Sequence, residues 1–213
     1  MTEATQFSTN EIKHWLENQT SAILTPVHTQ AKKLSEDMNA QLQTVTEISK
    51  MLLDNSTKEI EKRNMKVYNR ARALNKLAHL FLDRLKKLNP PEQISYDNLS
   101  KYTQDTQKII LVTDIDIKNW FPRISPFFIM DRRKFLTVHE RAKQSFNTLN
   151  DFVTKEYVKT KTLEETFQLI SELQALERQT IDIQAEISSI RNERLPIEKE
   201  IAELELKIAD LKS

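Results

Sequence analysis

The chain of 213 residues contains no glycine. Average usage would supply roughly 7%, or about fifteen glycines. Walker-type phosphate loops, dinucleotide-binding turns and nucleophile elbows all need glycine, because a side chain blocks their backbone conformations or close approaches. Most nucleotide-dependent enzyme classes are therefore excluded. Tight hairpin turns also prefer glycine, so its absence disfavours sheet-rich folds and favours long helices.

Cysteine is absent as well, which excludes disulfides, thiolate zinc sites and cysteine redox chemistry and fits an intracellular protein. No segment approaches the roughly 20 apolar residues that a membrane-spanning helix needs, and residues 1–10 do not resemble a secretion signal. We therefore predict a soluble, cytoplasmic chain. Charged residues make up 30% and apolar residues only 38%, which predicts a thin core for this length.

Apolar residues recur at helical spacing through most of the chain, which predicts an all-α fold. We expect an amphipathic helix over residues 1–26, and a long helix over residues 27–88 that a pair of prolines ends. A second long helix is expected over residues 131–213. Neither long helix can bury its apolar stripe alone. The pattern therefore favours an elongated antiparallel helical hairpin, with residues 89–130 as a small aromatic elbow and a coiled coil at the C-terminal end.

Two boundaries allow alternatives. Ser56 followed by Glu59 could cap a new helix inside the first long helix, but we favour a continuous one. In the elbow, a short helix is expected after Ser95, and the β-branched run over residues 108–120 could form a strand. We favour a helix whose second part is capped by Thr113 or Asp114 and which stops before Pro122, because no glycine turn or pairing strand is evident.

From residue 169 onward the spacing becomes a heptad repeat, typical of a coiled coil over about six heptads. With Leu173 at position a, the two polar core positions, Thr180 and Arg194, both fall at a. Polar a residues commonly fix register or partner, although Arg194 also lies two residues before Pro196, where a kink or a hairpin turn is equally compatible. The unbroken heptad phase favours a kinked continuous helix. We expect homodimerisation through the apolar positions: Leu169, Leu173, Leu176, Ile183, Ile187, Ile190, Ile197, Ile201, Leu204, Ile208 and Leu211.

These heptads resemble the coiled-coil arms of chromosome-maintenance (SMC-like) proteins and of nuclease-associated ATPases, over ~45 residues at the C-terminal end. The resemblance implies a coiled coil and no activity, because the ATPase parts of those families are missing here. In size, helicity and charge layout, the chain is also similar to ESCRT-type and BAR-type membrane-remodelling proteins. The repeat runs to the last residues without a capping signal, which leaves open whether the native polypeptide continues beyond Ser213.

Residues 120–135, WFPRISPFFIMDRRKF, hold five of the fifteen aromatic residues. We favour packing, with the rings closing the end of the hairpin where heptad contacts are absent. Membrane insertion is the weakest interpretation, although the cations over residues 132–134 would suit an anionic lipid surface. The alternative to packing is an exposed docking patch made of Trp120, Phe121, Phe127 and Phe128.

Ten cations and three acids lie between Lys58 and Lys87, a local net charge of +7 in a chain of net charge +1. Such a run could bind DNA or an anionic membrane surface. We favour pairing of these cations with residues 164–213, whose net charge is −6. On a helical wheel, the flank available for polyanion binding carries Lys62, Lys66, Lys76, Arg84 and Lys87.

Catalytic and metal-binding patterns are scarce. The histidines lie far apart without HExxH spacing, and His139 occupies a heptad core position, which predicts a packed histidine. Asp114 and Asp116 alone are too few for a metal site. We therefore predict no catalytic residue, no metal and no cofactor. The expected function is a non-enzymatic scaffold or adaptor that dimerises and docks a macromolecular partner, a protein in the first place, with polyanion binding as the alternative.

Overall fold

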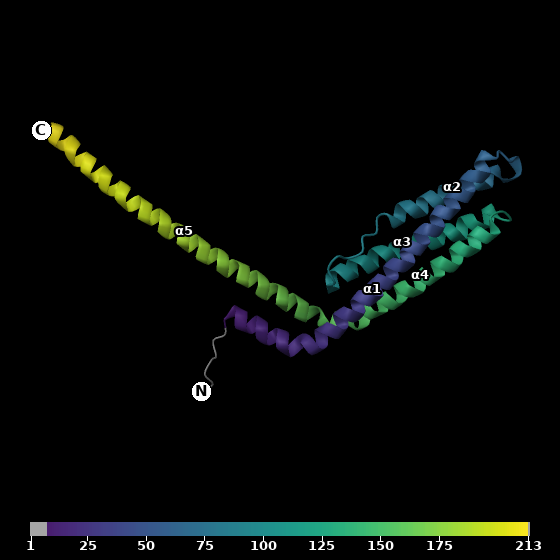
Figure 1. Cartoon of the computed structure of the whole chain (residues 1–213), viewed down its shortest axis with the longest axis horizontal. Helices are drawn as coiled ribbons and strands as arrows, with labels where there is room; N and C mark the ends of the chain where they lie inside the picture. Colours follow the sequence, from purple (N-terminus) through teal and green to yellow (C-terminus); the bar gives the residue numbers. More distant parts are fainter. Residues whose placement is uncertain (1–7, 213) are drawn as a thin grey trace. The chain divides into compact units, whose positions relative to one another are not determined.

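The structure is a computed structural model that describes residues 8–212, apart from the side chains of residues 209, 211 and 212 (Figure 1). The predicted all-α class is confirmed, and residues 8–212 contain no strand. The elements are α1 (Thr9–Glu61), α2 (Met65–Leu85), α3 (Tyr96–Ile124), α4 (Ile129–Lys155), the 3₁₀ helix η1 (Tyr157–Thr160) and α5 (Lys161–Lys212).

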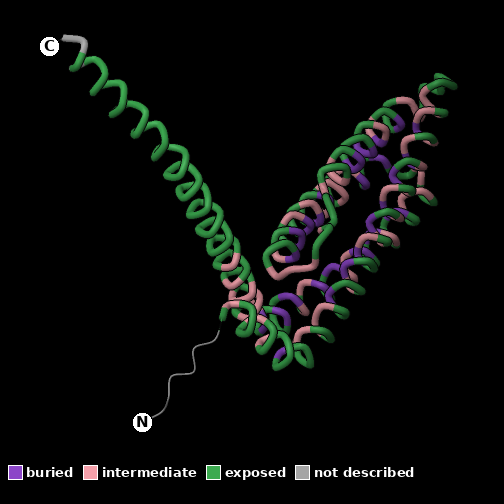
Figure 2. Tube along the Cα trace, turned by 60° about the vertical axis from the view of Figure 1, so that its left-hand side comes forward, coloured by how far each residue is buried: buried purple, intermediate pink, exposed green. Residues whose placement is uncertain are grey.

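The chain divides into two compact units. We call residues 20–164 the bundle. The described residues up to Gln19, together with those from Glu165 onward, form the arm unit. In the bundle, α1, α2, α3 and α4 run alternately up and down as a four-helix bundle, and Figure 2 shows that their buried residues lie on the facing sides.

The core of α1 follows a strict alternation of four-residue and three-residue steps. It includes three buried serines, Ser35, Ser49 and Ser56, between apolar residues. Ser49 and Ser56 satisfy their hydroxyls locally, by donating to the carbonyls of Val45 and Leu53. The buried apolar residues of this face of α1 are Ala31, Met38, Leu42, Val45 and Leu52.

Two predicted boundaries in the first half of the chain are wrong. Pro26 does not end a helix, because α1 continues through it to Glu61. The expected helix over residues 27–88 breaks at residues 62–64, and Ser56 caps nothing because its hydroxyl faces its own helix. The new cap is Asn64, whose side chain accepts from the backbone N–H of Lys66. Arg63 completes the turn with a left-handed φ of 51°.

The predicted elbow of short helices is also wrong, because α3 is one continuous helix of 29 residues. The helix favoured over a strand for residues 108–120 is confirmed, and Ser95 caps it by accepting from the N–H of Asn98 at 3.3 Å. Pro122 lies inside the last turn of α3 rather than beyond it, and the cap expected at Thr113 or Asp114 is wrong because both residues lie inside α3. After a turn at residues 125–128, α4 runs back along the bundle, so the expected elbow supplies a full helix of the core.

In the arm unit, α5 continues through Pro196, as the heptad phase predicts. The first turn of α1 lies beside α5. The hydroxyl of Thr9 donates to Glu177 Oε2 at 2.6 Å, and Gln174 Nε2 donates to Asn10 Oδ1 at 2.8 Å. These contacts join two segments more than 160 residues apart in sequence.

Candidate functional site

The predicted oligomerisation residues form one exposed face of α5. The ten described a and d side chains are 43% to 64% exposed, and Figure 2 shows α5 exposed along almost its whole length. The eleventh, Leu211, has a side chain outside the described residues. An apolar stripe of this length and spacing is the surface that a coiled-coil partner covers. We call this face the arm stripe: Leu169, Leu173, Leu176, Ile183, Ile187, Ile190, Ile197, Ile201, Leu204 and Ile208.

The contact between α5 and the start of α1 does not cover the arm stripe. Gln174, which binds Asn10, is half-buried, as are Phe167 and Ile170 on the same side of α5. The neighbouring stripe residues Leu169 and Leu173 stay exposed. Among the described residues, the first turns of α5 therefore have one half-buried face toward the start of α1 and one exposed face, which belongs to the arm stripe.

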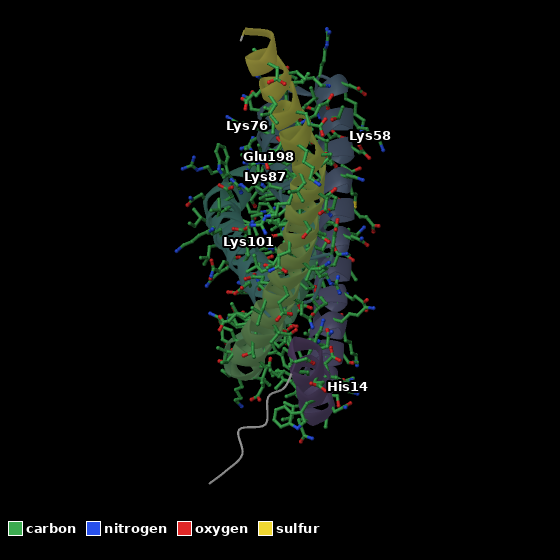
Figure 3. All side chains as sticks on the ribbon, turned by 90° about the vertical axis from the view of Figure 1, so that its left-hand side faces the viewer. His14, Lys58, Lys76, Lys87, Lys101 and Glu198 are labelled. Carbon is green, nitrogen blue, oxygen red and sulfur yellow. The ribbon has the colours of Figure 1, made fainter. Side chains whose placement is uncertain are left out.

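The predicted basic flank is interrupted. Arg84 does not belong to an open stripe, because its Nη1 lies 2.5 Å from Asp116 Oδ2 of α3 and the two side chains are only 22% and 16% exposed. Lys62 lies in the turn after α1 and pairs with Glu59 at 2.6 Å. The remaining members, Lys66, Lys76 and Lys87, are exposed. Figure 3 shows Lys76 and Lys87 on the side of the bundle away from Lys58.

The aromatic segment packs for the most part. Phe121 is 4% exposed and meets Phe135 edge-on at 5.9 Å between ring centroids, so the docking role predicted for Phe121 is wrong. Its place follows from α3 being continuous, because the core side of that helix carries Ile110, Phe121 and Ile124. The half-buried rings of Trp120 and Phe128 pack against the same core cluster.

Two acids of α3 bind cations from different neighbours. Asp116 pairs with Arg84 of α2. Asp114 binds two side chains of α4, His139 through Nε2 at 2.7 Å and Lys143 through Nζ at 3.0 Å. His139 is 5% exposed, so the predicted core histidine is confirmed. Partial burial opposes ionisation of Asp114, but the hydrogen bonds and charges of Lys143 and His139 outweigh it and hold its pKa below the usual 3.8. These pairs orient α3 between α2 and α4.

We expect Asp114→Asn to lower the free energy of unfolding of the bundle at neutral pH, and to make that free energy less dependent on pH in the acidic range. Because the folded-state pKa of Asp114 is depressed, its carboxylate stabilises the bundle above about pH 4. That contribution is lost as the pH falls below 3.8. Urea unfolding between pH 3 and 7 measures the effect. Asp105→Asn is the matched control, because Asp105 pairs only with Lys108 on the surface of α3; an equal loss there would contradict the assignment.

A second polar cluster surrounds Glu164, which lies in the first turn of α5. Its Oε1 accepts from Tyr157 Oη at 2.6 Å and from His28 Nε2 at 2.7 Å, and its Oε2 accepts from the N–H of Tyr96 at 2.8 Å. Burial and the Glu164 carboxylate both raise the pKa of Tyr157, so the phenol stays protonated and donates. The cluster therefore connects α1, α3, η1 and α5.

The remaining hollows suggest no chemistry. The hollow of about 570 Å³ beside the loop after α2 has lysines on its rim, Lys87 and Lys101, offset by the acids Glu92 and Asp105. Among the described residues, no group of three or more histidines and carboxylates is placed to hold a metal ion. Within residues 8–212 no helix is both long and apolar enough to cross a membrane.

The arm stripe could be predicted from the sequence, whereas the end of the bundle formed by the two short turns could not. The heptads identified the stripe. The meeting of residues 62–64 with residues 125–128 could not be read from either segment alone. No family model, no curated protein and no solved structure matches the chain, so comparison with known proteins assigns no role to either surface.

Proposed function

We propose that the protein is a non-enzymatic scaffold or adaptor that pairs with a second copy of itself through α5 and docks a macromolecular partner. The observation that carries this proposal is the exposed arm stripe, which continues at heptad spacing from Leu169 to Ile208. Covering the exposed half of each of these side chains contributes on the order of 1 kcal/mol. Ten such residues on each chain supply enough apolar surface for a stable coiled coil.

The charges beside the stripe disfavour a parallel pair. In parallel pairing, position g of one helix faces position e five residues further along the other helix. Among residues 172–208 one such contact joins opposite charges, Glu186 with Arg191. Arg194 would also face its own copy at a core position. Three contacts join two glutamates: Glu172 with Glu177, Glu193 with Glu198, and Glu200 with Glu205.

An antiparallel pair centred on Asn192 removes most of this repulsion. In antiparallel pairing, a faces d, g faces g and e faces e. Arg194 then faces Ile190 instead of a second arginine, and Glu186 with Glu193 is the one repulsive flanking contact among residues 172–208. Each flanking ion pair changes the free energy of pairing by only about 0.5 kcal/mol. The charges therefore favour one orientation, while burial of the apolar side chains provides most of the affinity. The attractive pairs are Glu172 with Lys207 and Arg191 with Glu198, each formed twice by symmetry.

Cysteine cross-linking tests both the pairing and its direction, because the chain has no cysteine of its own. In the antiparallel pair, Leu176 of one copy faces Ile208 of the other. We expect Leu176→Cys and Ile208→Cys proteins to form a disulfide with each other after mixing and refolding. Neither should form one with itself, since the two copies of position 176 would lie roughly 48 Å apart at 1.5 Å per residue.

Three results are distinguishable. A disulfide within each single variant means a parallel pair, so the orientation is wrong while self-pairing stands. A disulfide between Leu176→Cys and Ile201→Cys marks the neighbouring antiparallel register. No disulfide at any of these positions, together with a single-chain mass in solution, rejects self-pairing altogether. Leu206→Cys, which lies off the stripe on the same helix, is the control for random collision.

A further inference from the structure

The two short turns of the bundle meet at one end, and we call this end the tip, residues 58–70 and 118–134. Figure 1 shows the turns between α1 and α2 and between α3 and α4 side by side there. Asn55 Nδ2 donates to Asp131 Oδ1 at 3.2 Å, and the guanidinium of Arg70 lies 5.2 Å from the centre of the Phe127 ring. A shallow hollow is lined by both segments, including Lys58, Lys62 and Phe128.

The tip concentrates the positive charge of the protein. Its two segments hold ten cations and three acids, a net charge of +7, whereas the whole chain has a net charge of +1. Nine of the ten cations are exposed. Within the tip, Lys62 alone has a carboxylate at ion-pair distance, its neighbour Glu59. The other residues of the bundle, 20–57, 71–117 and 135–164, together have a net charge of +1, so most of the excess positive charge of the bundle lies at this end.

Exposed aliphatic side chains lie among these cations. Met65 is 83% exposed at the start of α2, and Met130 and Ile129 are 64% and 43% exposed at the start of α4. Neither methionine contributes to the core clusters of the bundle. Cations that surround protruding aliphatic side chains are typical of surfaces that bind anionic lipid, where the apolar groups enter the headgroup boundary.

The aromatic rings of the tip do not favour a nucleic acid. A base would stack on an open ring face, but the guanidinium of Arg70 lies over Phe127 and that of Arg123 lies 5.6 Å from the centre of the Trp120 ring. Phe121 is buried. The exposed large apolar side chains of the tip are those of Met65, Ile129 and Met130, which suit acyl chains and offer no stacking surface.

We propose that the tip binds the surface of an anionic membrane, with Met65, Ile129 and Met130 entering the headgroup region and the surrounding cations contacting acidic headgroups. The cations of the tip would then form one binding surface, built from two segments that lie about sixty residues apart in the chain. This binding is independent of α5, because every residue that it uses belongs to the bundle.

Vesicle flotation of the full-length protein tests the proposal. The vesicles contain phosphatidylcholine alone or with 30 mol% phosphatidylserine, at low salt. We expect binding to the anionic vesicles only, and loss of binding in high salt. Reversing Arg63, Lys66, Arg133 and Lys134 to glutamate should weaken it on the order of 100-fold or more. Met65→Ser with Met130→Ser should weaken it about tenfold without changing the charge.

The matched control reverses four exposed lysines elsewhere in the bundle, Lys32, Lys33, Lys50 and Lys101, and makes the same change in net charge. It should keep more than half of the binding, and circular dichroism should show all variants folded. Equal loss in the control, or no binding of the unmodified protein to anionic vesicles, would overturn the proposal. Tighter binding to a DNA duplex that the serine variant leaves unchanged would assign the tip to nucleic acid instead.

Discussion

The dimer that we propose through α5 is expected to separate into single chains of 25.0 kDa when Ile201 and Leu204 are both replaced by aspartate. These residues occupy adjacent a and d positions of the arm stripe, and each is 50% exposed in the single chain. In the pair they would place four carboxylates in a seam that otherwise excludes water, where unpaired charge is costly. The loss of apolar burial alone predicts at least ~4 kcal/mol, or about 1000-fold weaker dimerisation. Light scattering after gel filtration measures the mass directly.

The control for this result lies on the same helix. Leu195 and Leu206 are 57% and 68% exposed but fall outside the a and d positions. Their double replacement by aspartate adds the same charge to α5, and the dimer mass should persist. If it disappears as well, the apolar residues of α5 act without heptad geometry and the arm stripe is wrongly defined. A single-chain mass for the unmodified protein would reject dimerisation itself.

Phe135→Ala is expected to be the most damaging single truncation in the bundle. The Phe135 ring is fully buried, stacks on Phe81 at 4.6 Å between centroids, and contacts Phe121 and His139 at 5.9 Å each. Removing a buried phenylalanine typically costs about 3–5 kcal/mol, because the cavity left behind closes only in part. In a chain of this size the thermal midpoint should fall by roughly 10 °C.

Circular dichroism at 222 nm during thermal or urea unfolding measures the loss. Leu136→Ala is the matched control, because Leu136 is the next residue of α4 and is 41% exposed, so its loss should stay below about 1 kcal/mol. The dimer mass should be unchanged by Phe135→Ala under conditions where the bundle remains folded. A small effect of Phe135→Ala would mean that the ring stack adds little to the core, against the packing seen here.

The predictions from sequence succeeded where local chemistry decides the outcome. Heptad spacing predicted a helix that continues through Pro196, and the core histidine His139 follows from local spacing as well. These features depend on residues within a turn or two of each other. The same holds for the helix in residues 108–120, where no strand partner was evident in the sequence. The single long helix expected over residues 131–213 is wrong, because α4 ends at Lys155 and η1 separates it from α5.

The errors come from interactions between distant segments. A proline inside α1 removes one hydrogen bond, which the packing of the following turns outweighs, so Pro26 does not end the helix. The pairing of Arg84 with Asp116 joins positions 32 residues apart, and only the packing of α2 on α3 reveals it. The tip is the clearest case. Its two turns each hold a non-glycine residue at positive φ, Arg63 and Phe128, and neither segment indicates that it lies beside the other.

The hydrogen bonds of Glu164 also have a mechanical consequence. α5 begins at Lys161, so a pull along α5 reaches the bundle through its first turn, where Glu164 binds Tyr157, His28 and Tyr96. These three partners belong to three different elements of the bundle. The first turn of α5 is therefore held to the bundle by three bonds at once, and the loss of any one of them leaves two in place.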